Sequence, residues 1–243
     1  MEPIRIAKVI ASRGLCSRRE AEQLIARGWV SVEGETIIEP GTRVATNAAI
    51  TLDDRAHAFL RAKVTILLHK PIGVVSGQPE KGYPPAVSLI TTENHYNREQ
   101  GQQSLQAAHL AGLAPAGRLD IDSHGLLVLT QDGVVARQII GSESNVEKEY
   151  LVRFEGELTE EKLRLLNHGL CLDGKALKPA QVARLNENQL KFILREGRKR
   201  QIRRMCDLVG ITVVSLKRTR IGKVALADLP YGKWRFLRRD EMF

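Results

Sequence analysis

The segment Gly117–Gly133, with the sequence GRLDIDSHGLLVLTQDG, places an arginine and two acids directly before an apolar run. The run GLLVLT, residues 125–130, is typical of a strand buried within a sheet. A carboxylate just before such a strand is expected at the edge of the sheet, in a cleft. If it acts as a nucleophile or base it must stay ionised although partly desolvated, and a guanidinium within about 4–6 Å would keep it so. The segment therefore makes Asp120 a candidate catalytic residue that needs an arginine partner.

A second segment, residues 195–210, offers that arginine in the sequence REGRKRQIRRMCDLVG. Its apolar residues recur with the spacing i, i+3, i+4 and i+7, which predicts the core stripe of an amphipathic helix formed by Ile202, Met205, Cys206 and Val209. At about 100° per residue, Arg203 lies at the margin of this buried face, whereas Arg204 faces solvent or a ligand. Because an unpaired buried charge is costly, we expect Arg203 to pair with Asp120.

The same residues have two other interpretations. One is a structural salt bridge without a catalytic role. The other is a magnesium site built on Asp120 and Asp122, but such sites use several more oxygen ligands and no acidic cluster is obvious elsewhere in the sequence. We therefore expect no metal.

Composition limits the class of protein. Of the 243 residues, 43% are hydrophobic, which suffices for one large or two unequal domains with a packed core. Lys and Arg outnumber Asp and Glu by 37 to 28, and the resulting net charge of +9 favours a polyanionic partner. The three cysteines are odd in number and too far apart for a metal clip or a disulfide framework. Without an apolar stretch long enough for a signal peptide or a membrane span, we expect a soluble, cytoplasmic monomer that makes no membrane contact.

Two domains are predicted. Residues 1–55 form a small module, residues 56–63 a linker and residues 64–243 a larger domain, in which the polar segment 91–111 is an insertion or loop. The first strand of the larger domain, VTILLHK, is expected to be interrupted by Pro71 and Gly73 and then to resume. Because strands and helices mix irregularly, we expect class α+β with a mostly antiparallel mixed sheet flanked by helices.

The small module begins with a basic helix. Ser17 and Glu20 have the spacing of a capping box, so a helix is predicted to start there. Arg18 and Arg19 then occupy its first turn, where positive charge opposes the macrodipole by about 0.3–1 kcal/mol each. A phosphate bound by the helix amides and these arginines would offset that charge; a solvated basic face is the alternative. Further candidate contacts to a polyanion are Arg5, Lys8 and Arg13.

GRLDIDSHGLLVLTQDG resembles the signature of the RsuA/RluB/E/F-type pseudouridine synthases. Three further blocks match that family in the same order, LLHKPIGVVS, KEYLV and GRKRQIRRMC, and the tail KRTRIGKVALADLPYGKWRFL is similar to its closing segment. The first 55 residues resemble the small S4-like RNA-binding domain of the family. The resemblance covers nearly the whole chain apart from residues 91–111. Within the family, these sequence blocks are most similar to the synthase F type that acts on 23S rRNA.

The resemblance implies a function and a set of site residues. Asp120 would be the catalytic aspartate, attacking the uridine or removing a sugar proton, with Arg203 paired to it. Tyr150 would stack on the base, Arg118 would fill the gap left by the flipped nucleotide, and Lys148 would line the cleft. Further contacts to the RNA would come from Lys199, Arg200 and Arg204.

The implied reaction is the isomerisation of uridine to pseudouridine in ribosomal RNA, with 23S rRNA favoured and 16S rRNA or tRNA as alternatives. Such an isomerisation needs no redox cofactor and no group donor, which agrees with a sequence that shows no cofactor loop. Two other classes make different predictions. A non-catalytic RNA-binding assembly factor would form no pseudouridine, and a metal-dependent nuclease would be stopped by chelation.

Overall fold

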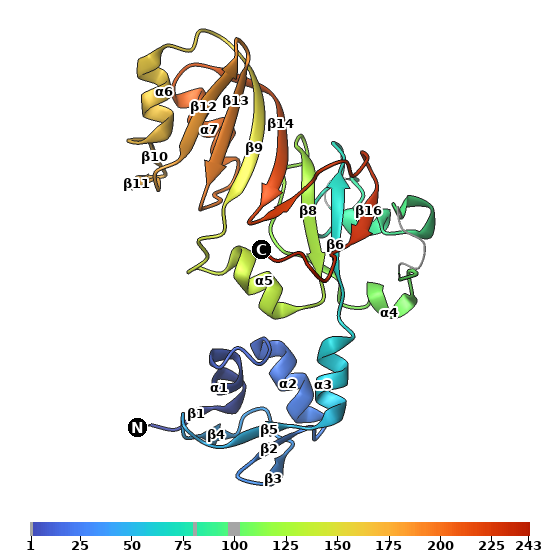
Figure 1. Cartoon of the computed structure of the whole chain (residues 1–243). Coiled ribbons are helices and arrows are strands. Elements are labelled where there is room, and N and C mark those ends of the chain that lie inside the picture. Colours follow the sequence, from blue (N-terminus) through green and yellow to red (C-terminus); the bar gives the residue numbers. More distant parts are fainter. Residues whose placement is uncertain (1, 80–81, 97–102) are drawn as a thin grey trace.

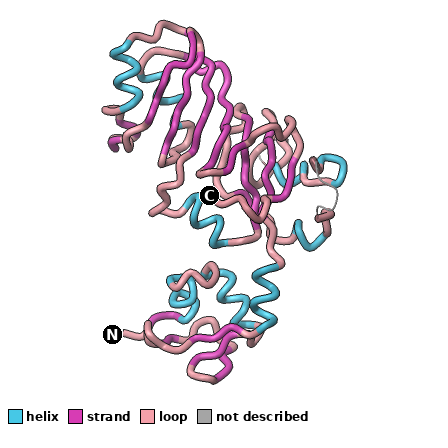
Figure 2. Tube along the Cα trace, viewed as in Figure 1, coloured by secondary structure: helices cyan, strands magenta, loops and turns pink. Residues whose placement is uncertain are grey.

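The computed structural model describes residues 2–79, 82–96 and 103–243. A small N-terminal domain and a larger domain with an extended sheet follow one another along the chain (Figures 1 and 2). They are joined by helix α3 (Asp54–Arg61), which takes up most of the expected linker 56–63. In the described part of the chain no helix is long and apolar enough to cross a membrane.

The N-terminal domain packs helices against short strands around its own core. Its elements are α1 (Ile6–Ser12), α2 (Arg18–Ala26), β1 (Ile4–Arg5), β2 (Val30–Val32), β3 (Glu35–Ile37), β4 (Arg43–Val44) and β5 (Ile50–Leu52). The predicted capping box of α2 is confirmed, because Ser17 accepts from the Glu20 amide and Glu20 accepts from the Ser17 amide. Helix α3 belongs to the same core through Ala56, which is fully buried.

The larger domain is built on one twisted sheet with the strand order β12-β13-β9-β14-β8-β6-β16. These strands are β6 (Thr65–Lys70), β8 (His124–Thr130), β9 (Lys148–Glu155), β12 (Gln181–Asn186), β13 (Gln189–Leu194), β14 (Thr212–Ile221) and β16 (Trp234–Phe236). Shorter strands are β7 (Ala114–Pro115) on β8, β15 (Val224–Ala225) on β14, and the separate hairpin β10 (Cys171–Leu172) and β11 (Lys175–Ala176). Among the described strands of this sheet, only β14 and β8 pair in parallel, so the predicted α+β class with a mostly antiparallel sheet is confirmed.

The parallel pair β14–β8 joins two halves of the sheet. Its register comprises two residue pairs, Lys217 with His124 and Arg218 with Gly125. Gly125 has φ +113°, and a methyl group there would overlap the backbone of Arg218, so only glycine fits at this close approach. Each half has its own hydrophobic clusters, and Tyr150 packs against a cluster of each half.

Helices cover the two halves. These helices are α4 (Ala107–Leu110), α5 (Gly133–Ile140), α6 (Glu160–Asn167) and α7 (Gln201–Leu208), together with the 3₁₀ turns η1 (Ala86–Leu89) and η2 (Thr92–Asn94). The predicted stripe of α7 is buried, with Ile202, Met205, Cys206 and Val209 between 0% and 6% exposed.

The structure differs from the sequence prediction after Gly73 and describes the segment 91–111 only in part. The strand expected to resume after Gly73 does not form: Val75 makes only an isolated bridge to Pro85, because Gly73 turns the chain with φ +81° and Ser76 bonds to another loop. The segment 91–111, predicted to be an insertion or loop, contains η2 and α4, and its central residues 97–102 lie outside the described residues.

Candidate active site

Asp120 lies in a loop that is held on both sides by the segment after β6. The Ser76 hydroxyl donates to the Leu119 carbonyl at 2.8 Å and accepts from the Leu119 amide at 2.9 Å. On the other side of Asp120, the Gly73 amide donates to the carbonyl of Ile121 at 2.9 Å. The amide of Ser123 closes the turn by donating to the Asp120 carbonyl at 3.1 Å. The backbone of the candidate acid is therefore fixed before any substrate binds.

The Asp120 loop opens into a cavity of about 970 Å³. The cavity brings together seven of the residues predicted from the sequence: Arg118, Asp120, Lys148, Tyr150, Lys199, Arg200 and Arg203. Its lining contains nine cationic side chains, Arg118, Lys148, Lys178, Arg195, Arg198, Lys199, Arg200, Arg203 and Arg218. The acids of the lining are Asp120 and Glu196. Such a balance suits a polyanionic ligand.

The predicted ion pair between Arg203 and Asp120 is wrong, because Arg203 pairs with Asp122. Its Nε lies 3.3 Å from Asp122 Oδ2, and its Nη2 donates to the Asp122 carbonyl at 2.9 Å and to Ser123 Oγ at 3.4 Å. Nη1 donates to the carbonyl of Val213 at 3.1 Å. The turn explains the difference, since it aims residue 122 at helix α7. Asp120 itself has neither a hydrogen bond nor an ion pair to its carboxylate among the residues that the structure describes.

Arg200 also binds Asp122, with Nη2 donating to Oδ2 at 3.0 Å. Arg200 precedes α7 and has φ +52°, a left-handed conformation that is uncommon for a residue other than glycine. Burial raises the pKa of Asp122, but the Arg200 hydrogen bond and the Arg203 charge outweigh it and hold that pKa below its ordinary value. Asp122 is thus an ionised anchor that ties the Asp120 loop to α7.

Arg204 does not line the cavity. It forms two hydrogen bonds to Asp173, at 3.0 and 2.6 Å, on the far side of α7. The sequence placed Arg204 away from the buried face and Arg203 at its margin, and this is confirmed by side-chain exposures of 35% and 11%.

Lys70 is a site residue that the sequence analysis missed. It ends β6, is fully buried and donates to the carbonyls of Pro71 at 2.8 Å and Val74 at 2.7 Å. Burial lowers its pKa to about 8, although the nearby charges of Asp120 and Asp122 raise it. The signal was present as a lysine within the apolar run ILLHKPIG. Its charge interacts with the two acids of the Asp120 loop.

Arg218 is the second missed residue, and it crosses the junction between β14 and β8. It is 4% exposed, with Nε donating to the Leu126 carbonyl at 2.7 Å and Nη1 to the Arg118 carbonyl at 3.3 Å. Within the described ranges its Nη2 has no hydrogen-bond partner, although Arg218 lines the cavity. In the sequence, the segment around Arg218 stands out only as part of the tail KRTRIGKVALADLPYGKWRFL.

Tyr150 and Lys148 enter the cavity from β9. Both side chains are half-buried, and Tyr150 is registered with Arg218 on one neighbouring strand and with Phe192 on the other. Burial lowers the pKa of Lys148, and the charges of Arg218 and Lys178 lower it further. An aromatic ring beside a carboxylate gives the cavity a surface on which a planar base can stack.

The basic residues predicted to bind RNA in the N-terminal domain divide into two groups. Arg13 and Arg18 contact other residues of the chain, whereas Arg5, Lys8 and Arg19 make no such contact to the described residues. Arg13 donates to the carbonyls of Thr46 at 2.8 Å and Ala48 at 2.7 Å, so this predicted RNA contact also has a structural role. Arg18 lies 3.6 Å from Glu22. In the part of the chain described, the exposed side chains of Arg5, Lys8 and Arg19 form no ion pair or hydrogen bond.

At the start of α2, where the sequence predicted a bound phosphate, a carboxylate of the same chain is already bound. The Glu20 carboxylate accepts the Ser17 amide, and Ser17 Oγ accepts the Glu20 amide. Glu20 thus supplies the negative charge that offsets the two arginines of the first turn.

The site therefore combines a fixed carboxylate, an aromatic side chain and a cationic rim. Residues 64–208 match the sequence model of RNA pseudouridylate synthase, and residues 4–50 match that of the S4 domain. The dual-specificity RNA pseudouridine synthase RluF of Escherichia coli (strain K12) is 35% identical over 98% of this chain and 77% of its own length.

Two further relatives span nearly the whole chain. The ribosomal large subunit pseudouridine synthase B of Bacillus subtilis (strain 168) is 33% identical over 98% of this chain and 93% of its own length. A crystal structure of a pseudouridylate synthase superposes with a TM-score of 0.64 at 27% identity, covering 97% of this chain and 96% of that one. The chain is an enzyme that belongs to the RNA pseudouridylate synthase family and carries an S4 domain at its N-terminal end.

Proposed function

We propose that this enzyme isomerises specific uridines of 23S ribosomal RNA, with Asp120 as the catalytic carboxylate. The observation that carries the proposal is the position of Asp120, held between Ser76 and Gly73 in a cationic cavity that also contains Tyr150. The large-subunit name of the Bacillus subtilis relative supports 23S rRNA as the substrate. We also propose that the protein acts in the cytoplasm as a monomer.

The target nucleotide must leave its base stack before it can reach Asp120, because the reacting carbon C1′ is covered in a helix. We assign Tyr150 to stacking on the flipped base, which contributes about 1–3 kcal/mol. Arg118, exposed at the cavity rim, fills the gap that the nucleotide leaves in the RNA. Lys148, Lys199 and Arg200 bind the flanking phosphates.

The reaction breaks the bond between C1′ and N1 and forms one between C1′ and C5. The proton on C5 is lost and N1 gains one, so that no atom is added and no electron is transferred overall. Asp120 serves either as a nucleophile at C1′ or as a base that removes a sugar proton, and both roles require the ionised carboxylate. The absence of any ion pair to Asp120 among the described residues leaves its oxygens available for this step.

The test is to map pseudouridines in cells with and without the gene. We expect the deletion to remove pseudouridine from one or a few positions of 23S rRNA, and the wild-type gene to restore it. Asp120→Asn should accumulate to the wild-type level without restoring the modification. Asp240→Asn, a change of the same kind at an exposed side chain, should restore it. An unchanged map would refute the proposal, whereas loss from 16S rRNA or tRNA would refute the assignment to 23S rRNA.

A further inference from the structure

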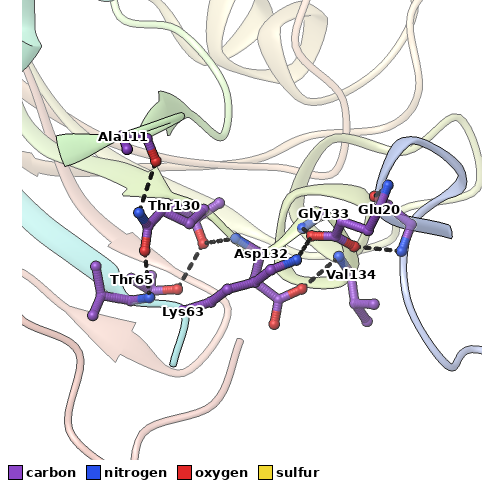
Figure 3. Close-up of polar contacts among 11 residues, drawn as sticks. Glu20, Lys63, Thr65, Ala111, Thr130, Asp132, Gly133 and Val134 are labelled. Carbon is purple, nitrogen blue, oxygen red and sulfur yellow. Dashed lines mark hydrogen bonds and ion pairs between the residues drawn. The ribbon is translucent and has the colours of Figure 1, made fainter. Parts of the chain in front are cut away.

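Glu20 connects the two domains. It lies in α2 of the S4 domain and is only 7% exposed. Besides capping its own helix, its carboxylate accepts the amide of Gly133 at 2.9 Å, and Gly133 is the first residue of α5 in the catalytic domain. Figure 3 shows this carboxylate between Lys63 and Gly133 at the start of α5. One acid therefore caps two helices that belong to different domains.

The buried charge of Glu20 is balanced by Lys63. The two side chains form an ion pair in which each is 9% exposed. Burial raises the pKa of Glu20, but the hydrogen bonds from Lys63, Gly133 and Ser17 outweigh it and keep that pKa below its ordinary value. Because Lys63 follows α3, the connector between the domains takes part in the contact.

The end of the connector is fixed as well. Val64 exchanges hydrogen bonds with Gln131, its amide donating to Gln131 Oε1 at 3.0 Å and its carbonyl accepting the Gln131 amide at 3.0 Å. Next to this pair, the hydroxyls of Thr65 and Thr130 lie 2.7 Å apart (Figure 3). The chain therefore passes between the domains without a free segment.

Helix α5 extends from this contact to the active site. Its other end lines the cavity through Ile139, Ile140 and Gly141. A methyl group at Gly117, which begins the loop that carries Asp120, would lie 3.2 Å from Ile140 Cγ2. The eight residues of α5 span about 12 Å. A second bond between the domains reaches the same helix, from Arg137 Nη1 to the Ala11 carbonyl at 3.3 Å.

We propose that Glu20 and Gly133 lock the S4 domain onto α5. The basic S4 surface, formed by the exposed side chains of Arg5, Lys8 and Arg19, and the catalytic cavity then contact one RNA at a fixed spacing. The lock makes Glu20 and Gly133 positioning residues that select RNAs long enough to reach both surfaces. This inference rests on the proposed reaction on RNA. The pre-formed arrangement raises affinity because the second surface binds within the same complex.

Gly133 offers a selective way to open the contact. It has no positive φ, so its backbone accepts alanine, but a methyl group there would overlap Cβ and Oγ of Ser17 across the domain interface. Gly133→Ala therefore disfavours docking while leaving each domain able to fold. Gly41→Ala is the matched control in the S4 domain, because Gly41 also lacks a positive φ and has nothing within 4 Å of the added atom.

Docking can be measured without a substrate by double electron–electron resonance. One spin label is attached to Cys171, an exposed cysteine of the catalytic domain, and the other to Ile38→Cys, at a side chain of the S4 domain that is 64% exposed. Cys16 and Cys206 are buried, and burial raises their pKa values to about 11 and about 12, so they do not compete for the label. We expect one narrow distance distribution for wild type and Gly41→Ala and a broad one for Gly133→Ala.

The functional readout compares two RNAs, a 23S rRNA transcript and a short stem-loop that carries the mapped uridine. For Gly133→Ala we expect KM to rise on the order of 10-fold or more for the long transcript and to stay unchanged for the stem-loop. A narrow distance distribution in Gly133→Ala, or a broad one with equal KM effects on both RNAs, would overturn the proposal. Failure of the 23S assignment would appear as inactive wild type on these RNAs, with the distance measurement unaffected.

Discussion

Ser76 holds Leu119 by two hydrogen bonds, one accepted and one donated by the same hydroxyl. Because Leu119 directly precedes Asp120, this pair fixes the backbone of the proposed catalytic acid. Ser76→Ala leaves a buried amide and a buried carbonyl unpaired, which costs about 1–3 kcal/mol. We expect kcat on the mapped RNA to fall roughly 10-fold or more, because the Asp120 carboxylate is then held less firmly in its reactive position. Ser88→Ala, at an exposed serine whose hydroxyl bonds to the Pro85 carbonyl, should leave kcat unchanged, and equal rates in both variants would contradict this role.

Arg203 and Arg204 are adjacent but have different energetic roles. Arg203→Ala removes the hydrogen bonds to Val213, Asp122 and Ser123 and leaves Arg200 as the remaining partner of the Asp122 carboxylate. Because buried acceptors lose their donor, the free energy of unfolding should fall by about 1–3 kcal/mol. Arg204→Ala breaks an exposed pair with Asp173 and should lower the free energy of unfolding much less than Arg203→Ala does. Denaturant unfolding measures both values. Similar losses would show that Arg203 does not anchor the Asp120 loop.

Lys70 makes stability depend on pH in the alkaline range. The folded protein releases the Lys70 proton near a pKa of about 8, whereas the unfolded chain keeps it up to the ordinary value of 10.5. The unfolded state therefore binds more protons in this window, and stability rises with pH between these values. Relative to Lys70→Met, the free energy of unfolding of wild type should increase by up to about 3 kcal/mol from pH 8 to 10.5. Parallel pH curves for the two proteins would contradict the lowered pKa.

The salt dependence of RNA binding separates the two groups of basic residues in the S4 domain. Arg19 is exposed and unpaired among the described residues, so if it contacts a phosphate, Arg19→Ala should reduce the slope of log K against log salt by about 0.7–0.9. Arg13→Ala should instead lower stability by about 0.5–1.5 kcal/mol, because two carbonyls lose their donor. An unchanged slope for Arg19→Ala would mean that this side chain is free in the complex.

The sequence predicted the fold class and the main elements because these depend on local patterns. The capping box at Ser17, the buried apolar stripe of α7 and the strand that ends at Thr130 could each be predicted from residue spacing and type alone. The partner of Arg203 could not, because the choice between Asp120 and Asp122 depends on how the turn aims each side chain. Spacing places both acids before the same strand but does not say where either side chain points.

Residues that act across long sequence separations were also missed. The charges of Asp120 and Asp122 act on Lys70, whereas the local sequence shows only a lysine in an apolar run. Glu20 was predicted as a helix cap, but its second partner, Gly133, lies 113 residues further along the chain. Such contacts depend on the tertiary arrangement of the two domains, which no local pattern encodes.

The two halves of the large sheet meet along the short β14–β8 pairing, and one hydrophobic cluster crosses this junction through Leu126, Val128 and Ile221. Each half also has a cluster of its own. Asp120 belongs to the half that contains β8, and Tyr150 to the half that contains β14. Moderate heating that parts these two strands would separate the acid from the aromatic ring while both cores survive. Thermal inactivation should therefore precede the loss of circular dichroism, because the junction would open before the separate clusters of the two halves unfold.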